Sequence, residues 1–314
     1  MQKILLKKEL NNFISGLMKQ YQVIAPVKTG NTKFKIVENL KDLNNLYLEK
    51  ITQVSVKKFF LPENEILVSF KNGKMNEGQD KIKERVIFGL RKCDLNGLLI
   101  LDMAMKHPSY FNKRKKTILI GIYCENPDKF CFCNSMRLED CYDLFFYPKG
   151  KEYYISVGSE KGKKLVQNLI NAKKEYTPKI KNTKLLNNKD IGKEYRNKNW
   201  KKDADKCLSC GACTAYCPTC NCFDIRDEVE VNLRDGKRVM RESSCQLKSF
   251  SRVAGGKVFR ESRLARFKHF VYHKIVYFKN QCNRYMCVGC GRCLRVCPTN
   301  IDWVNTINKI KEEK

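Results

Sequence analysis

The chain has 314 residues, 17 cysteines and a formal net charge of +29. This length allows a substantial core and two domains. The sequence starts with charged and polar residues instead of a hydrophobic signal region, and no apolar run is long enough to span a bilayer. These features argue against a disulfide-rich secreted protein. We expect a cytoplasmic protein without direct membrane insertion, in which the cysteines are reduced metal ligands.

The excess of positive charge is spread over the whole chain. Most of the positive residues are lysines among asparagines, as in residues 181–189. This pattern is typical of compositional bias, and we interpret it first as a solvated surface. A docking face for acidic partner subunits is the second interpretation. Nucleic acid is the third and weakest, so we do not expect it as a partner.

The first part of the chain predicts one amphipathic helix and several short strands. Apolar residues at helical spacing predict a helix over residues 6–19. Strand-like runs follow at 22–25, 34–37 and 65–70, separated by turn residues. None of these segments carries residues that indicate chemistry.

A βαβ unit is predicted next. Residues 86–90 and 117–123 are apolar runs typical of buried strands. Between them, Asp94 can cap a helix that runs from Leu95 to about Lys106. The two strands of such a unit are parallel, so the N-terminal part of the chain is predicted to be an α/β domain.

Four cysteines are expected at the carboxyl edge of these two strands. Cys93 follows the first strand, Cys124 ends the second, and the next loop supplies Cys131 and Cys133. Open α/β sheets build their sites at this edge, so the four thiols form a candidate third iron–sulfur site. The alternative is that they are buried and unreactive, as we also expect for Cys141, because free cysteine is among the most buried residue types.

The composition changes after the predicted α/β domain. Two more strands, at 143–147 and 152–157, and a helix at about 161–172 complete residues 1–172. Residues 173–203 are rich in Lys, Asn, Glu and Tyr with little periodicity, which predicts a surface linker or a loosely packed helix.

The remaining residues, 204–314, are predicted to form a mainly helical ferredoxin-like domain. Residues 261–278 place apolar side chains on one helical face. This segment lies in the long connection between two cysteine motifs, which a compact two-cluster ferredoxin lacks. The predicted architecture is therefore α+β or α/β, with an enlarged helical two-cluster domain after the sheet.

Both cysteine motifs follow the pattern CxxCxxCxxxCP. The first runs from Cys207 to Pro218 and the second from Cys287 to Pro298. In this pattern three cysteines bind one cubane and the fourth binds the neighbouring one. We therefore expect two [4Fe-4S] clusters with exchanged fourth ligands, cluster 1 on Cys207, Cys210, Cys213 and Cys297, and cluster 2 on Cys287, Cys290, Cys293 and Cys217.

Zinc is the competing metal for these eight cysteines. Zinc ribbons use CxxC pairs separated by a spacer and close one four-ligand site, which two runs of four cysteines with a trailing proline match poorly. Gly211 and Gly291 fit a cluster better, because glycine lets backbone N–H groups approach the inorganic sulfides.

Three further cysteines follow the first motif. Cys220 and Cys222 come just after Cys217, and Cys245 lies downstream. They are alternative ligands of the third cluster, thiols beside the motif clusters, or structural cysteines, and their spacing does not separate these interpretations.

Arginines are dense in the same region. A solvated helical face is the first interpretation, and the second is that guanidinium groups raise the potential of an anionic cluster or receive an acidic partner. The arginines concerned are Arg234, Arg238, Arg241, Arg252, Arg260, Arg263 and Arg266.

The sequence has no pattern for a catalytic site of its own. It lacks a GxGxxG after a strand, a P-loop and a GxSxG elbow. His269 and His273 are interpreted as surface or core histidines. We expect a redox subunit without nucleotide, flavin or hydrolytic chemistry.

Taken together, these residues resemble the family of sulfhydrogenase beta subunits, which is related to the iron–sulfur subunit of anaerobic sulfite reductase. The resemblance extends over nearly the whole chain. It is carried by residues 25–27, 58–62, 65, 91–95, 131–136, 217–222, 244–245, 273–274 and 287–293. One departure is Asn221, where the resemblance predicts an aromatic residue.

The resemblance implies a cytoplasmic iron–sulfur electron-transfer subunit. Its partners would be a flavin subunit that handles NAD(P)H and a catalytic subunit with a nickel–iron centre or siroheme. Because Cys93, Cys124, Cys131, Cys133, Cys220, Cys222 and Cys245 also belong to the family pattern, it favours a third cluster and leaves the ligands open. The iron–sulfur subunit of anaerobic sulfite reductase is the close alternative. A basic nucleic-acid-binding protein with a structural or sensing cluster is the alternative of another class.

Overall fold

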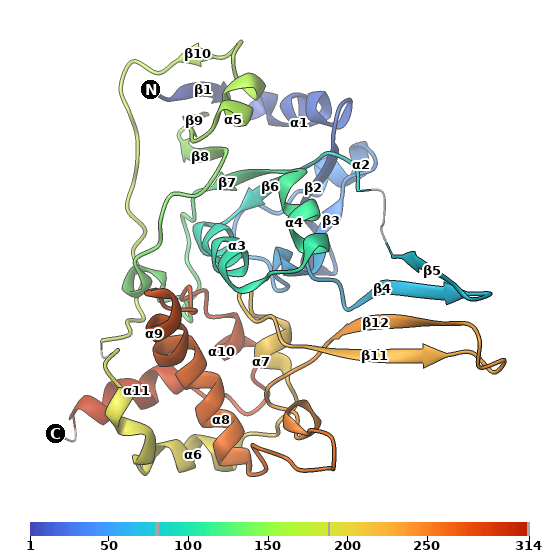
Figure 1. The fold of residues 1–314 in the computed structure, drawn as a ribbon. Helices are drawn as coiled ribbons and strands as arrows, with labels where there is room; N and C mark the ends of the chain where they lie inside the picture. The colour runs from blue at the N-terminus through green and yellow to red at the C-terminus, as the bar shows by residue number, and fades with distance from the viewer. Residues whose placement is uncertain (79–81, 188, 313–314) are drawn as a thin grey trace.

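A twisted sheet of eight strands is the largest element of the N-terminal part (Figure 1). The computed structural model describes residues 1–78, 82–187 and 189–312. Four adjacent strands, β8, β7, β6 and β2, are parallel to one another, and all other neighbouring pairs are antiparallel. In spatial order the strands are β10 (Ile170–Asn171), β1 (Lys3–Leu6), β9 (Glu152–Val157), β8 (Leu144–Lys149), β7 (Thr117–Ile122), β6 (Arg85–Leu90), β2 (Gln22–Thr29) and β3 (Asn31–Ile36).

Helices cover both faces of this sheet. All residues of β6 and β7 are buried, as expected for parallel strands covered on two sides. Val86 and Phe88 face the side that packs against α1 (Leu10–Met18), and Ile87 faces the side that packs against α3 (Lys92–Ala104). The remaining helices of this part are α2 (Leu40–Asn44), α4 (Pro108–Lys115) and α5 (Glu160–Leu165), with short 3-10 turns at Lys7–Glu9, Val56–Phe59 and Cys133–Met136.

The βαβ prediction is confirmed, with differences at its edges. β6 and β7 are parallel and α3 connects them. The helix begins at Lys92 and not at Leu95, because Asp94 lies inside its first turn and accepts a hydrogen bond from the backbone N–H of Arg91 at 3.4 Å. Strand β1 was not predicted, and the helix expected at 161–172 ends at Leu165.

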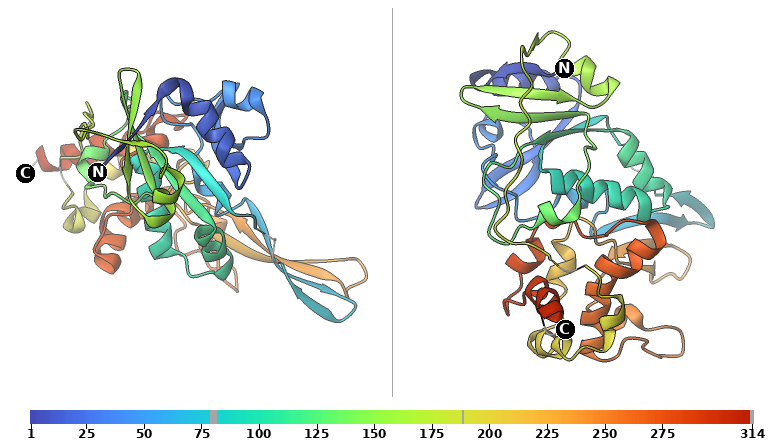
Figure 2. Two further views of the ribbon diagram at one scale, coloured as in Figure 1. Left: turned by 90° about the horizontal axis from the view of Figure 1, so that it is seen from above. Right: turned by 90° about the vertical axis from the view of Figure 1, so that its left-hand side faces the viewer.

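A second sheet of four strands extends from the body of the molecule (Figures 1 and 2). It pairs two hairpins from distant parts of the chain, and we call it the arm. Its strands, in spatial order, are β11 (Phe223–Val229), β12 (Gly236–Glu242), β4 (Asn64–Lys71) and β5 (Lys74–Glu77). The connection between the cysteine motifs therefore starts with a hairpin, and the expectation of a mainly helical C-terminal part is not confirmed.

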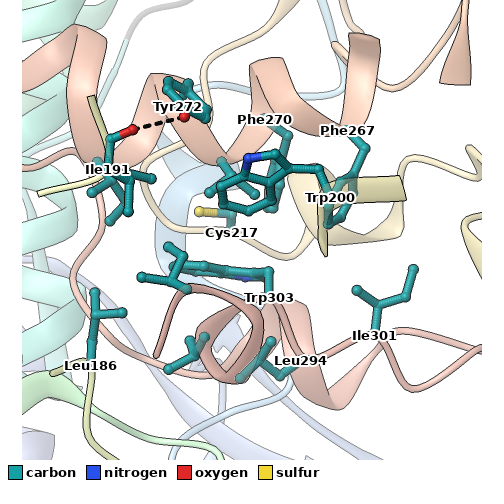
Figure 3. Close-up of a cluster of buried hydrophobic side chains, with 14 of the residues drawn as sticks. Leu186, Ile191, Trp200, Cys217, Phe267, Phe270, Tyr272, Leu294, Ile301 and Trp303 are labelled. Atoms are coloured by element: carbon teal, nitrogen blue, oxygen red, sulfur yellow. Dashed lines mark hydrogen bonds between the residues drawn. The ribbon is translucent and has the colours of Figure 1, made fainter. Parts of the chain in front are cut away.

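Helices make up most of the remaining C-terminal part. They surround a core that contains Trp200, Tyr272 and Trp303 (Figure 3). Leu186 and Ile191, from the predicted linker, also pack into this core, and Tyr272 donates a hydrogen bond to the Ile191 carbonyl at 2.7 Å. The elements are a 3-10 turn at Gly192–Arg196, α6 (Asn199–Lys206), α7 (Ala212–Ala215), a 3-10 turn at Ser249–Ser251, α8 (Arg263–Tyr272), a π-helical turn at His273–Tyr277, α9 (Phe278–Cys282), α10 (Arg292–Arg295) and α11 (Trp303–Glu312).

Candidate iron–sulfur sites

The first motif forms one wall of a cavity beside α7. Gly211 has φ +80° and starts this short helix, so that Cys207, Cys210 and Cys213 all line the cavity. Cys297 of the second motif lines the same cavity. The structure therefore brings together the four cysteines expected to bind cluster 1. Their environment is apolar, with the side chains of Leu208, Phe267, Phe270, Ile301 and Trp303 around them.

The second motif forms a matching group with Cys217. Burial raises the pKa of Cys293 well above its usual value, and the neighbouring thiolates of Cys287, Cys217 and Cys290 raise it further. Burial also raises the pKa of Cys287 to about 12, against the opposing effect of Lys274. The fourth cysteine of the first motif thus lies beside the three cysteines of the second, as the exchange of ligands requires.

The donor set fits iron–sulfur clusters. Burial raises the pKa of Cys213 to about 12, and the close thiolates of Cys207 and Cys217 add to the effect. A buried thiol with a raised pKa keeps its proton at pH 7 unless a cation takes the place of the proton. Bound iron provides that positive charge. When bound, such clusters supply one-electron transfer.

Backbone and side-chain N–H groups point at the motif sulfurs. Ser209 N donates to Cys207 Sγ and Gly289 N donates to Cys287 Sγ, each at 3.4 Å, from equivalent positions of the two motifs. The indole N–H of Trp303 donates to Cys293 Sγ, also at 3.4 Å. Hydrogen bonds to sulfur stabilise the more negative reduced state of a cluster, so these contacts suit an electron-transfer site.

Two glycines let the second motif pack directly on the loop that follows β7. Gly291 has φ +70°, and a Cβ atom there would lie 2.5 Å from the carbonyl carbon of Phe130. Gly289 has φ +65°, and a Cβ atom there would lie 2.7 Å from the backbone of Cys133. Phe132 N also donates to the Gly289 carbonyl at 2.8 Å. The two parts of the chain therefore meet at the cysteine sites.

Replacing Gly289 with alanine is expected to destabilise this contact. The left-handed backbone alone costs about 1–2 kcal/mol for alanine, and the overlap with the Cys133 backbone adds to it. Gly255→Ala is the matched control, because Gly255 has φ +81° and, apart from its chain neighbours, no described residue lies within 4 Å of the position that a Cβ would take. Anaerobic urea unfolding should give a clearly lower midpoint for Gly289→Ala, and equal midpoints for the two variants would contradict the contact.

The four cysteines of the N-terminal part lie close together beside Cys290. Burial raises the pKa of Cys131, and the thiolates of Cys290, Cys133 and Cys124 add to this effect. Cys131 Sγ donates to the Cys290 carbonyl at 3.5 Å. Cys93, in the first turn of α3, faces Cys133 and Cys290 in the same way. The thiols expected at the carboxyl edge of β6 and β7 thus converge.

The other three cysteines form a separate group on the side of the first motif. Cys220 lies against Cys217, and Cys222 lies against Cys245. Cys245 also faces Cys213. A hydrogen bond donated by the Cys245 thiol lowers the pKa of Cys222 to about 7. These thiols neighbour the motif cysteines and not the group at the sheet edge.

Two buried cations near the cysteines were not predicted. The side chain of Arg292 is fully buried and forms an ion pair with Asp94 at 2.7 Å. Lys274 is 2% exposed, and its Nζ lies 3.2 Å from Cys217 Sγ and 3.2 Å from Cys220 Sγ. The only signal in the sequence was that both residues belong to segments that carry the family resemblance.

Three arginines of the predicted group form contacts with carboxylates and carbonyls. Arg238 and Arg241 pair with Asp227 and Glu228 on the arm. Arg266 donates to the carbonyls of Gln246 and Arg260 and so holds two loops. These three guanidinium groups stabilise the fold and have carboxylate or carbonyl partners.

Single-ion sites are absent from the part of the chain that the structure describes. No group of three or more His, Cys, Asp or Glu side chains there is arranged to hold one metal ion. The described helices also include none that is long and apolar enough to cross a membrane.

Comparisons with known proteins agree with this site. A family described as "4Fe-4S dicluster domain" matches residues 206–301. A curated relative, sulfhydrogenase 2 subunit beta of Pyrococcus furiosus, is 32% identical over 96% of this chain and 95% of its own. No solved structure matches the chain. The region that contains both cysteine motifs is therefore an iron–sulfur domain.

Proposed function

The chain belongs to the family of sulfhydrogenase beta subunits, and from this premise we propose that it relays electrons between a flavin subunit that handles NAD(P)H and a catalytic subunit. The observation that carries the proposal is the cavity shared by Cys207, Cys210, Cys213 and Cys297, which combines both motifs in one site. Such sites need no acid–base group from the protein to transfer electrons.

We assign two [4Fe-4S] clusters to the eight motif cysteines, with Cys217 and Cys297 exchanged between the motifs. The chain itself supplies the thiolates, the N–H donors at Ser209 and Gly289, and apolar side chains around the cysteines. Low polarity around the sites strengthens every charge interaction with them.

We also propose a third cluster, bound by Cys93, Cys124, Cys131 and Cys133. Cys131 and Cys133 lie near Cys124, and Cys93 lies near Cys133, which supports this ligand set over the alternative of Cys220, Cys222 and Cys245. Cys220 and Cys245 lie against Cys217 and Cys213. These two neighbours are already assigned as ligands of the motif clusters.

The proposed division of the chain follows from the same contacts. Residues 1–172 form the α/β part and 204–314 the cluster part. Much of the expected linker belongs with the cluster part, because Leu186, Ile191 and Trp200 pack into its core.

The proposed partners and location rest on the family. The relative's name describes a subunit of a sulfhydrogenase, and the family resemblance favours a nickel–iron catalytic subunit as the partner. Exposed apolar side chains on the arm, among them Met75, Ile225 and Val229, are typical of surfaces that contact other proteins. We propose a cytoplasmic complex.

Anaerobic iron and sulfide analysis of the purified chain tests the proposal. Two clusters correspond to about eight irons per chain and three to about twelve, and we expect about twelve. Dithionite should produce reversible paramagnetic signals. Fewer than four irons with stoichiometric zinc would contradict electron transfer. Co-purification with a nickel–iron or a siroheme subunit would separate a sulfhydrogenase from a sulfite reductase.

A further inference from the structure

Lys274 is a buried cation whose polar contacts are sulfurs and a hydroxyl. Its Nζ lies 3.2 Å from the Sγ atoms of Cys217 and Cys220 and 3.4 Å from Thr219 Oγ1. These are all the hydrogen bonds of this ammonium group among the described residues. Lysine is almost never fully buried unless it is paired, so these contacts must compensate the charge.

The backbone is distorted where Lys274 enters the core. It lies in the π-helical turn His273–Tyr277, which interrupts the helix between α8 and α9. Such single turns occur frequently at functional sites. The Lys274 carbonyl accepts a hydrogen bond from Met286 N at 2.9 Å, just before Cys287. The backbone of the turn is therefore tied to the second motif, and its Lys274 side chain reaches Cys217 of the first motif.

The charges around Lys274 are those of thiols. Burial opposes its ammonium form, and the polar atoms closest to Nζ are the sulfurs of Cys217 and Cys220, each at 3.2 Å. His273 is adjacent in the chain, and burial lowers its pKa to about 4, so that it is neutral at pH 7. The positive charge of Lys274 also acts to lower the pKa values of Cys213, Cys222 and Cys245.

Arg292 provides the contrast within the same region. It approaches Cys290, but Asp94 lies 2.7 Å from its guanidinium group and cancels its charge. Lys274 has no such carboxylate contact among its hydrogen bonds to the described residues. Of the two buried cations, Lys274 is the one whose field acts fully on the sulfurs.

We propose that Lys274 raises the reduction potential of the cluster bound through Cys217 and makes it the preferred electron acceptor within the chain. This inference rests on the proposed function. A positive charge and N–H donors at a ligand sulfur stabilise the state with one more electron, and the dry surroundings strengthen the effect. In each reduction one electron passes from an external donor to the cluster, and no bond to Lys274 forms or breaks.

Lys274→Met and Lys274→Gln test the inference, because both remove the charge and glutamine retains an N–H donor. In potentiometric titrations with dithionite as reductant, one paramagnetic signal should shift to a more negative midpoint in both variants. The same signal should disappear in Cys217→Ala. Lys274→Arg keeps the charge and should stay nearer to the wild type.

Lys268→Met is the matched control, since Lys268 lies on α8 with its Nζ over the ring of Tyr195 instead of at sulfur. It should leave all midpoints unchanged. Wild-type midpoints in Lys274→Met and Lys274→Gln, at full iron content, would overturn the role of Lys274 and leave the proposed function intact. A wild-type chain without reversible signals would overturn the proposed function itself. If Lys274→Met loses iron, Lys274→Gln and Lys274→Arg decide the question.

Discussion

Cys217→Ala is expected to remove the cluster of the second motif, and Cys297→Ala that of the first. In each variant the iron content should fall by about four atoms per chain, because an alanine cannot replace the fourth thiolate. The expectation follows from the cavity that Cys297 shares with Cys207, Cys210 and Cys213, and from the thiolates that surround Cys293.

The signal that disappears identifies the pairing of ligands. Cys217→Ala should lose the same paramagnetic signal as Cys287→Ala, and Cys297→Ala the same one as Cys207→Ala. Cys141→Ala is the control, since Cys141 Sγ donates weakly to the Glu139 carbonyl at 3.8 Å and faces none of the motif cysteines in its contacts with the described residues. If Cys217→Ala instead matched Cys207→Ala, each motif would bind its own cluster and the exchange of ligands would be wrong.

Local spacing explains why these sites could be predicted from the sequence. A CxxCxxC loop brings three sulfurs together within a few residues of backbone, so the pattern itself implies the geometry. The placement of Cys93 and Cys124 at one edge of the sheet could be expected for a similar reason, because neighbouring parallel strands end at the same edge.

The arm could not be predicted in this way. Alternating residues identify strands, but they do not say which distant strand is the partner. Pairing β12 with β4 joins two hairpins that lie far apart in the sequence. This pairing also places the start of the connection between the cysteine motifs in a sheet, where the sequence had predicted helices.

The buried cations were missed because their chemistry depends on contacts between the two parts of the chain. A lysine in an amphipathic helix and an arginine inside a cysteine motif are both expected at the surface. Arg292 instead lies in the first turn of α10, and its ion pair with Asp94 connects the second motif to α3. The positions of Lys274 and Arg292 thus follow from contacts between distant segments, which no local sequence pattern reveals.

Breaking the Arg292–Asp94 pair is the second change with a large expected effect. Arg292→Met leaves the Asp94 carboxylate buried, with its ion-pair partner gone, and removes the hydrogen bonds that Arg292 donates to the carbonyl and hydroxyl of Thr52, each at 3.0 Å. Removing one partner of a buried pair costs about 3–5 kcal/mol. Anaerobic urea unfolding of the iron-loaded chain should show a much lower midpoint.

The double variant Asp94→Leu/Arg292→Met separates the pair from the rest of the interface. Apolar replacements of both partners leave no buried charge, so the double variant should unfold at a higher urea concentration than Arg292→Met alone. Arg238→Met is the control for loss of an exposed ion pair, which contributes only about 0–1 kcal/mol. An Arg292→Met midpoint equal to that of Arg238→Met would mean that the buried pair does not hold the second motif against α3. A lower midpoint together with an unchanged iron content would show that the pair stabilises the contact between the two parts and that the clusters do not depend on it.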